Sequence, residues 1–301
     1  MRGQVIRVSG VQSLVEIEDA HWQCEIRGRL KSGIRTTNSP IIAGDWVEVT
    51  PTTEHAGIIE LVHPRTSQFS RAASGSRSIE QNLSVNIDQL IVVVSAKQPS
   101  PRVGFIDRAI MMAIKGNIKP IICVNKTDLT TRDAIDLLIA PYEALEYPVY
   151  RTSALHGEGM RELNDTICER ISIVVGQSGV GKSTILNFIE PGLGLRTGEI
   201  MKRHNRGRHT TTAVQWFKLK CGGYIVDTPG IKELRLWGIK STELGRYFPE
   251  FEDFIQQCQF VDCSHLHEPS CAVRQAKFAG DIAESRYEGY RRIFESLQEY
   301  E

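Results

Sequence analysis

The first 65 residues alternate between apolar and polar positions. Residues 21–27 are the clearest case, because Trp22, Cys24 and Ile26 fall on one face and polar side chains on the other. A period of two is typical of a half-buried β-strand. Similar patterns occupy residues 4–8, 13–17, 45–49 and 57–62. Short strands in this succession predict a small closed β-barrel, either an OB-fold or a generic β-sandwich or SH3-like barrel.

The pattern changes after this region. Residues 66–82 are rich in Ser, Arg and Gln and have no apolar period, which predicts a linker or mobile loop. Beyond residue 85, apolar runs that predict strands lie at 87–94, 120–124, 171–175 and 224–226, and helical patterns lie at 105–115 and 184–189. This alternation predicts an α/β fold with a mainly parallel sheet covered on both faces. The residues after about 240 are more charged and helical in pattern.

Composition narrows the class of protein. The chain has 301 residues, a length that suggests two or three domains, and its 41% apolar and 24% charged residues exclude a disordered or fibrous protein. Its apolar runs are shorter than the ~18 residues of a membrane span, and its first residues lack the pattern of a signal peptide, so we expect a cytoplasmic protein. Lys plus Arg equals Asp plus Glu at 36 each, which argues against coating nucleic acid through bulk charge.

Residues 176–183 read G-Q-S-G-V-G-K-S and fit the P-loop pattern G-x-x-x-x-G-K-S/T. A predicted strand precedes them and a predicted helix follows, as a P-loop requires. Its backbone N–H groups would point at phosphate oxygens, Lys182 would reach the β- and γ-phosphates, and the Ser183 hydroxyl would bind Mg²⁺. The predicted phosphate-binding residues are Gly176, Gln177, Ser178, Gly179, Val180, Gly181, Lys182, Ser183 and Thr184.

A second motif selects the base. Residues Asn125, Lys126, Thr127 and Asp128 follow a predicted strand and read N-K-T-D. The Asp128 carboxylate can accept hydrogen bonds from N1–H and the 2-amino group of guanine, whereas adenine would leave it unpaired. Lys126 can lay its stem across the base. Ser153 and Ala154 fit the loop whose backbone N–H contacts the guanine carbonyl.

A third motif completes the nucleotide site. Residues 227–230 read D-T-P-G and follow the predicted strand 224–226. In the pattern D-x-x-G, Asp227 holds Mg²⁺ through water and the Gly230 N–H senses the γ-phosphate. The first switch segment (residues 202–212) should lie between the P-loop and Asp227, with Thr211 as the residue that contacts Mg²⁺ and the γ-phosphate, and Thr210 as its alternative.

The usual group that positions the attacking water is missing from this sequence. Ile231 follows Gly230 where Ras-type enzymes carry a water-orienting Gln, and an isoleucine cannot orient water. Hydrolysis must therefore use another group or be slow on its own. His209 in the first switch segment is the candidate, and its alternative role is contact with RNA or phosphate. Residues 196–208 hold five Arg or Lys against one acidic residue, Glu199, which makes either a patch for RNA phosphates or a solvated loop.

The seven cysteines divide into two groups. In a cytoplasmic protein they should be reduced. The scattered residues Cys24, Cys123, Cys168 and Cys221 are each expected to be small core residues.

The remaining cysteines cluster with histidines near the end of the chain. The set Cys258, Cys263, His265 and Cys271 has the composition of a closed tetrahedral zinc site, and His267 is a competing ligand. A closed set leaves no position for a substrate water, so the predicted zinc is structural. The alternative is reduced cysteines that cluster without a metal.

The order of the nucleotide motifs is unusual, because N-K-x-D and Ser-Ala precede the P-loop and D-x-x-G. This order resembles the circularly permuted small-ribosomal-subunit biogenesis GTPases of the RsgA type. The segments that carry the resemblance are residues 86–89, 176–183, 207–212, 227–230 and 263–269. Departures are modest: Ile87 replaces Val in N-V-D-Q, and Ile231 stands where the family often has Phe.

The resemblance implies an OB-fold barrel at residues 1–70, a permuted GTPase domain at 71–240 and a zinc-binding C-terminal domain at 241–301. It implies binding to the small ribosomal subunit and its rRNA, GTP hydrolysis stimulated by that subunit, release on hydrolysis and a role in late subunit maturation. It also selects His265 as the fourth zinc ligand. We expect a monomer, because nothing in the sequence indicates an obligate oligomer.

Two other functions stay open from the residues alone. The missing Gln would suit an RNA-binding module that uses GTP only as a ligand. An ATP-driven P-loop enzyme is disfavoured by Asn125 and Asp128.

Overall fold

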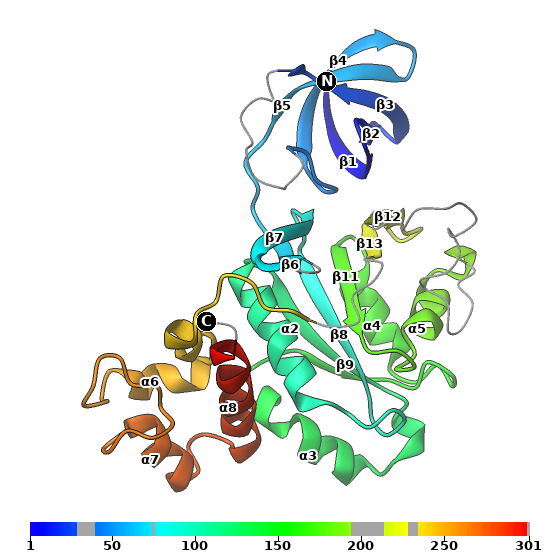
Figure 1. The fold of residues 1–301 in the computed structure, drawn as a ribbon. Coiled ribbons are helices and arrows are strands. Elements are labelled where there is room, and N and C mark those ends of the chain that lie inside the picture. The colour runs from blue at the N-terminus through cyan, green and yellow to red at the C-terminus, as the bar shows by residue number, and fades with distance from the viewer. Residues whose placement is uncertain (29–39, 74–75, 194–213, 228–233, 300–301) are drawn as a thin grey trace.

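The computed structural model describes residues 1–28, 40–73, 76–193, 214–227 and 234–299. The N-terminal barrel stands at one end of the molecule, the central sheet with its helices lies below it, and the C-terminal helices pack beside helix α2 (Figure 1). No helix within the described ranges combines the length and apolar character needed to cross a membrane.

The predicted barrel is confirmed. Its strands are β1 (Arg2–Ser9), β2 (Gln12–Ile17), β3 (Ala20–Ile26), β4 (Trp46–Thr53) and β5 (Ala56–Val62). They close in the order β1-β2-β3-β5-β4, which fits an OB-fold. Alternation places Cys24 and Ile26 inside with Trp22 half-buried, while polar neighbours face solvent. The barrel thus has a small core of its own, separate from that of the sheet.

The prediction of a linker or mobile loop at residues 66–82 is wrong. Strands β6 (Gln68–Ala73) and β7 (Ser76–Val85) pair there as an antiparallel hairpin. Phe69, Ala72, Leu83 and Val85 are buried, and Phe69 and Leu83 join the core that also holds α2. These apolar residues are too few and too unevenly spaced to give a period, and two register shifts interrupt the pairing of the strands.

The central sheet is mainly parallel, as predicted. Its strands are β8 (Gln89–Ser95), β9 (Lys119–Asn125), β10 (Val149–Arg151), β11 (Ile171–Gly176), β12 (Gln215–Lys218) and β13 (Tyr224–Asp227). The order across the sheet is β10-β9-β8-β11-β13-β12, and β12 alone among these strands runs antiparallel to its neighbour. Parallel strands place their carboxyl ends at one edge, where ligands bind in such sheets.

Helices cover both faces of this sheet. They are α2 (Val103–Lys115), α3 (Arg132–Glu143), α4 (Met160–Ile167) and α5 (Lys182–Ile189), with the short 3₁₀ turns η1 (Thr127–Leu129) and η2 (Pro191–Leu193). Helices α2 and α3 share a core with Val92 and Val124, whereas α4 and α5 pack against Val93 and Ile121 on the other face. The alternate residues of each strand therefore belong to different cores, as continuous apolar runs predict.

The C-terminal region is helical and docks on the sheet domain. It contains η3 (Ser241–Tyr247), η4 (Pro249–Phe251), α6 (Glu252–Ile255), α7 (Ala272–Ala279) and α8 (Glu284–Gln298). Arg286 of α8 is buried between the carboxylates of Glu250 and Asp107, the latter on α2, and its Nε donates to Glu250 Oε1 at 2.6 Å. Tyr142 Oη also donates to Asp107 at 2.9 Å. Breaking such a buried pair leaves an uncompensated charge, so this contact fixes α8 to α2.

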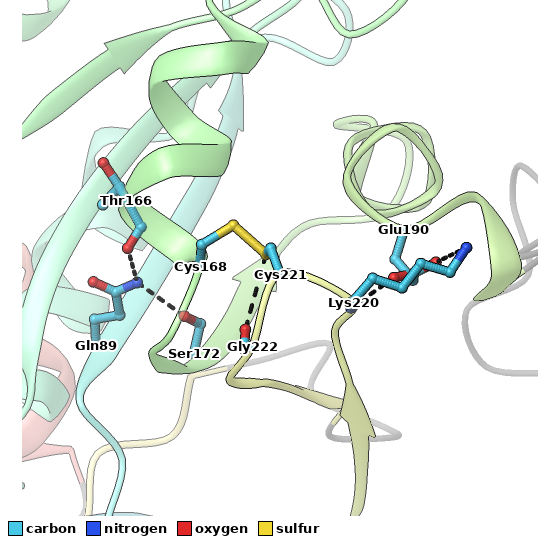
Figure 2. Close-up of a disulfide and its surroundings, with 8 residues drawn as sticks. All are labelled: Gln89, Thr166, Cys168, Ser172, Glu190, Lys220, Cys221 and Gly222. Carbon is cyan, nitrogen blue, oxygen red and sulfur yellow. Dashed lines mark hydrogen bonds and ion pairs between the residues drawn. A yellow bond between two sulfur atoms is a disulfide. The ribbon is translucent and has the colours of Figure 1, made fainter.

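Cys168 and Cys221 contradict the expectation that every cysteine is reduced and that these two lie in a core. They form a disulfide between the end of α4 and the turn that joins β12 to β13 (Figure 2). The two residues are 53 positions apart, but β11 and β13 are neighbours and begin side by side, with Ile171 opposite Tyr224. Cys221 is exposed. Cys24 and Cys123 are buried free thiols, as predicted.

Candidate functional site

The predicted nucleotide motifs meet at one edge of the central sheet. The P-loop follows β11, the N-K-T-D segment follows β9, Ser153 lies just beyond β10, and Asp227 ends β13. All these strands run parallel, so their carboxyl ends share that edge (Figure 1). The permuted order along the chain therefore still assembles one site in space.

Two glycines give the P-loop its shape. Gly179 and Gly181 have φ values of +82° and +100°, in the left-handed region that favours glycine. A Cβ on Gly181 would come within 2.1 Å of the Asn125 side-chain nitrogen. Glycine at 181 is thus required both by the backbone conformation and by the close approach of Asn125.

Lys182 begins helix α5 and folds back over the loop. Its Nζ donates to the carbonyl oxygens of Gly176 at 2.6 Å and Gln177 at 2.7 Å. Burial lowers the pKa of Lys182 to about 8, and the nearby charge of Asp227 partly opposes this shift. Ser183 is buried beside it. A half-buried cation held by carbonyl dipoles can transfer its hydrogen bonds to phosphate oxygens, which would also raise its pKa again.

Asn125 joins the base-recognition loop to the P-loop. Its Nδ2 donates to the Val180 carbonyl at 2.9 Å, while its Oδ1 accepts from the Ala154 N–H at 3.0 Å and from Thr152 Oγ1 at 3.2 Å. The motif predicted base recognition at Asn125 and missed this bridging role. It also missed Thr152, for which sequence gives no signal.

Lys126 and Asp128 flank the region beside the P-loop. Ser153 Oγ donates to Asp128 Oδ1 at 2.5 Å, which orients the carboxylate. Lys126 adopts a left-handed conformation, with φ +63°, and its Nζ donates to the carbonyls of Gln98 and Gly179, both at 2.6 Å. Its stem therefore extends from the base-recognition loop to the phosphate loop, where a base could stack on it.

The remaining predicted residues divide between described and undescribed positions. Thr127 lies in η1 and its N–H donates to the Thr152 carbonyl at 3.2 Å, and Thr184 lies in the first turn of α5. His209, Thr211 and Gly230 lie outside the residues that the structure describes.

The C-terminal cysteines and one histidine form a cluster able to hold a metal ion. Ligand atoms of Cys258, Cys263, His265 and Cys271 all lie within 4.8 Å of one another. The Cys258 and Cys271 sulfurs are 3.9 Å apart, and His265 Nδ1 lies 3.5 Å and 3.6 Å from them. Tetrahedral zinc with its usual bond lengths would separate two sulfurs by about 3.8 Å and a sulfur from a nitrogen by about 3.6 Å. The donor set and its spacing therefore fit zinc.

Hydrogen bonds outside the cluster orient its loop. Tyr287 Oη of α8 donates to the His265 carbonyl at 2.7 Å, and Tyr290 Oη donates to the Ser264 carbonyl at 2.7 Å. Burial would raise the pKa of Glu268, but hydrogen bonds from Ser264 and neighbouring backbone N–H groups lower it to about 2. His267 is exposed and lies outside the cluster.

A cavity of about 260 Å³ lies away from both sites. Hairpin β6–β7, the end of α2 and the segment 236–239 line it, and Lys115 and Trp237 are among its residues. Lys115 lies over the Trp237 ring, 4.5 Å from its centroid. The cavity therefore marks a junction between the hairpin and the chain that follows the D-T-P-G motif.

Comparisons with known proteins agree with this geometry. The family model described as RsgA GTPase matches residues 62–237. A protein of Gemmatimonas aurantiaca named "Small ribosomal subunit biogenesis GTPase RsgA" is 38% identical, over 96% of this chain and 94% of that one. A protein of the same name from Thermotoga maritima is 39% identical, over 99% and 97% of the two chains.

Solved structures give the same result. The crystal structure of YjeQ from Thermotoga maritima matches with a TM-score of 0.81 and 37% identity, over 99% of this chain and 98% of that one. The structure of YloQ, described as a circularly permuted GTPase, matches with a TM-score of 0.76 and 28% identity, over 100% and 96% of the two chains. The barrel, the permuted sheet and the C-terminal region thus all have counterparts, and the chain belongs to the RsgA GTPase family.

Proposed function

We propose that this chain hydrolyses the β–γ phosphoanhydride bond of GTP during late maturation of the small ribosomal subunit. The observation that carries the proposal is the position of Asn125, which hydrogen-bonds to Val180 in the P-loop and to the Ala154 N–H at once. These hydrogen bonds support the proposal because they join the loop that would select guanine to the loop that would bind the phosphates. The names of the curated relatives supply the process.

At the phosphate end, the P-loop backbone N–H groups would surround the phosphates and Lys182 would neutralise their charge. Ser183, Asp227 and Thr211 would hold Mg²⁺, which supplies neutralisation of the charge that develops on the β- and γ-oxygens. The burial of Lys182 supports this assignment, because a partly desolvated ammonium gains strongly from an anionic partner.

At the base end, Asp128 would accept two hydrogen bonds from guanine. Ser153 Oγ already donates to one oxygen of this carboxylate and holds it in place. Lys126 would support the base along its stem, between its backbone and the Gly179 carbonyl. Positioning by rigid neighbours lowers the entropy lost on binding.

His209 is our candidate for positioning the attacking water, with Gly230 and Thr211 sensing the γ-phosphate. The support is chemical: Ile231 lacks a polar atom, and His209 is an imidazole in the segment that follows the P-loop. An intrinsic rate that is slow without a partner follows from the missing Gln.

The C-terminal cluster would hold one structural zinc. Three thiolates and an imidazole fill a tetrahedral shell, so no position is left for a catalytic water. We propose the division into a barrel (1–70), a GTPase domain (71–240) and a zinc-binding domain (241–301). The barrel, the zinc-binding domain and the basic segment 196–208 would contact rRNA, in a monomer that works in the cytoplasm with the subunit.

The proposal predicts nucleotide-dependent binding to small ribosomal subunits. Sedimentation through a sucrose cushion would compare the protein with a non-hydrolysable GTP analogue, with GDP and without nucleotide. The analogue should increase the fraction bound by about tenfold over GDP, because ligands shift equilibria by such differential affinities. Lys182→Ala should lose the effect, and large subunits should not substitute.

Equal sedimentation in every nucleotide state would overturn the proposal that GTP controls binding to the small subunit. Nucleotide-dependent binding without any GTP hydrolysis would support the RNA-binding module instead.

A further inference from the structure

The disulfide between Cys168 and Cys221 closes a covalent ring around the phosphate-binding part of the chain. The two cysteines are 53 residues apart. The P-loop, helix α5 and the first switch segment lie between them in the sequence. Of the residues proposed to act on the phosphates, only Asp227 and Gly230 fall outside the ring, and Asp227 follows Cys221 by six residues.

One side of the disulfide is fixed to the sheet. Cys168 caps helix α4, just before β11. Gln89 at the start of the central strand β8 donates from Nε2 to the Thr166 carbonyl and to Ser172 Oγ, both at 2.9 Å (Figure 2). The end of α4 is thereby tied to β8 and β11, so Cys168 is a rigid attachment point.

The other side is a turn that contacts the phosphate-binding helix. The Lys220 N–H donates to Glu190 Oε2 at 3.0 Å, and Lys220 Nζ lies 3.4 Å from Glu190 Oε1 (Figure 2). Glu190 directly follows helix α5, and α5 begins with the P-loop residue Lys182. The hydrogen bond from the Lys220 N–H lowers the pKa of Glu190, so the carboxylate is a stable acceptor. A shift of this turn would act on the far end of α5.

The hairpin formed by β12 and β13, whose turn holds Cys221, also contacts the barrel. Lys218 Nζ lies 2.6 Å from Glu16 Oε1 and contacts Asp19, and Trp216 Nε1 donates to Ser84 Oγ at 3.1 Å. The turn that holds Cys221 thus belongs to the β12–β13 hairpin, which contacts the barrel, hairpin β6–β7 and the residue that follows α5. Its second strand, β13, ends at Asp227, which is proposed to hold Mg²⁺.

The disulfide is accessible to thiols. Cys221 is exposed and Cys168 is half-buried. Disulfides in reducing compartments are usually transient and redox-sensing. The inference that this disulfide meets a reducing environment rests on the proposed function, which places the protein in the cytoplasm.

We propose that Cys168 and Cys221 form a thiol–disulfide exchange site, at which a dithiol reductant opens the ring and weakens binding of Mg²⁺–GTP. A thiolate of the dithiol attacks Sγ of Cys221, and the S–S electron pair leaves with Sγ of Cys168, which takes a proton from water. The second thiolate of the dithiol attacks the dithiol's own sulfur in the mixed disulfide, and Cys221 leaves as a thiolate that also takes a proton from water. Two electrons pass to the protein, which gains two thiols, and the dithiol becomes a disulfide.

Opening the ring frees the turn from its rigid attachment point. Backbone hydrogen bonds from the Glu169 N–H to the Gly222 carbonyl at 3.0 Å and from the Tyr224 N–H to the Arg170 carbonyl at 2.9 Å remain. The hairpin therefore stays in the sheet but gains freedom, and Asp227 and α5 are less well organised for nucleotide. Lost pre-organisation lowers affinity without removing any ligand-contacting residue.

The test uses the full-length protein in dithiothreitol redox buffers from oxidising to reducing. Alkylation and mass spectrometry would give the oxidised fraction of the Cys168–Cys221 pair, and a fluorescent non-hydrolysable GTP analogue with Mg²⁺ would give Kd. We expect Kd to rise by about fivefold or more on reduction, the lower end of typical coupling between sites. Kd should rise in proportion as the oxidised fraction falls, and amide exchange in residues 214–227 should become faster.

The double variant Cys168→Ser/Cys221→Ser is the matched control, because it keeps the zinc-ligand cysteines. It should have the Kd of the reduced protein in every buffer, and any residual redox response would report on the metal cluster. A Kd equal within twofold in both forms, or a disulfide that stays closed throughout the reducing buffers, would overturn the proposal. Absence of GTP binding in the oxidised protein would instead mean that the nucleotide site itself is wrong.

Discussion

Single residues have two kinds of role at the nucleotide site. Some contact the ligand in the proposed function, as Asp128 does, and others connect the loops, as Asn125 does through Val180 and Ala154. The N-K-T-D motif predicted both positions, but only the structure shows that the Asn125 amide is buried and hydrogen-bonded through both its nitrogen and its oxygen. Selectivity for guanine should therefore depend on Asp128 and assembly of the site on Asn125.

Asp128→Asn should change the preferred base from guanine to xanthine. An amide can donate to the 2-oxo group of xanthine but cannot accept two hydrogen bonds from guanine. Charge-assisted bonds contribute about 1.5–3 kcal/mol each, so affinity for GTP should fall by about a hundredfold. Competition between GTP and XTP for a fluorescent nucleotide would measure this.

Asp133→Asn is the matched control for that substitution. Asp133 is exposed in the first turn of α3, five residues along the chain. An unchanged preference for GTP in Asp128→Asn, or an equal loss in Asp133→Asn, would contradict the assignment.

Lys182 should make nucleotide affinity depend on pH near 8. Its pKa is lowered to about 8 by burial, and bound phosphates would raise it again. The complex then holds more protons than the free protein, so affinity should decline as pH rises through about 8, by up to about tenfold per pH unit. Isothermal titration with GDP between pH 7 and 9.5 would show proton uptake on binding.

Lys182→Arg tests the source of that pH dependence, because a guanidinium does not titrate in this range. An affinity of the wild-type protein that is flat from pH 7 to 9.5 would contradict the role of Lys182.

At the scale of elements, the sequence predicts strands and helices best where apolar residues recur at a regular spacing or form a continuous run. The barrel strands and the buried parallel strands have periods of two or continuous apolar runs, and both kinds are found as predicted. Hairpin β6–β7 was missed because Phe69 and Leu83 stand among polar residues and acquire their burial only in the tertiary core that they share with α2. The disulfide was missed for a related reason: adjacency of Cys168 and Cys221 comes from the pairing of β11 with β13, which sequence spacing does not encode.

The metal cluster should hold the C-terminal elements together. Between α6 and α7 the described chain has little regular structure, and the cluster brings its ends to one point. Structural zinc contributes about 10–16 kcal/mol of apparent binding free energy in zinc-finger peptides. Chelation should therefore lower the melting temperature and speed amide exchange in residues 252–279 more than in the central sheet.

Metal analysis should find about one zinc per chain, and Cys271→Ala should lose it, whereas His267→Ala, outside the cluster, should keep it. Less than half an equivalent of zinc in the wild-type protein would contradict a structural zinc site.

At the scale of the whole molecule, the permuted order puts the D-T-P-G segment directly before the C-terminal region. The chain from Leu234 to Ile239 passes the cavity beside α2 and then enters η3, and α8 is fixed to α2 through Arg286. On the other side, β12 contacts the barrel through Lys218. Both flanking regions are thus connected to strands or segments next to residues proposed to sense the γ-phosphate, which would let nucleotide state affect how these regions dock.

The motifs therefore give predictions for the chemistry of the site but none for its connections to the rest of the molecule. Phosphate and guanine recognition can be predicted from residue types at a fixed spacing. Backbone N–H groups of a P-loop bind phosphate oxygens, and a carboxylate binds the N–H groups of guanine. The links from the site to the barrel and to α8 depend on single polar side chains, Lys218 and Arg286, whose partners lie 199 or more and 36 or more residues away respectively. Such pairs have no local signature in one sequence.

The most direct test of the central claim is the rate of GTP hydrolysis measured against the concentration of added small ribosomal subunits. The account predicts slow turnover by the protein alone, a saturable rise with subunits, no turnover in Lys182→Ala and a lost rise in His209→Ala if the imidazole positions the water. GTP hydrolysis that is absent with and without subunits, or that does not respond to them, would contradict the claim that this chain is a subunit-stimulated GTPase.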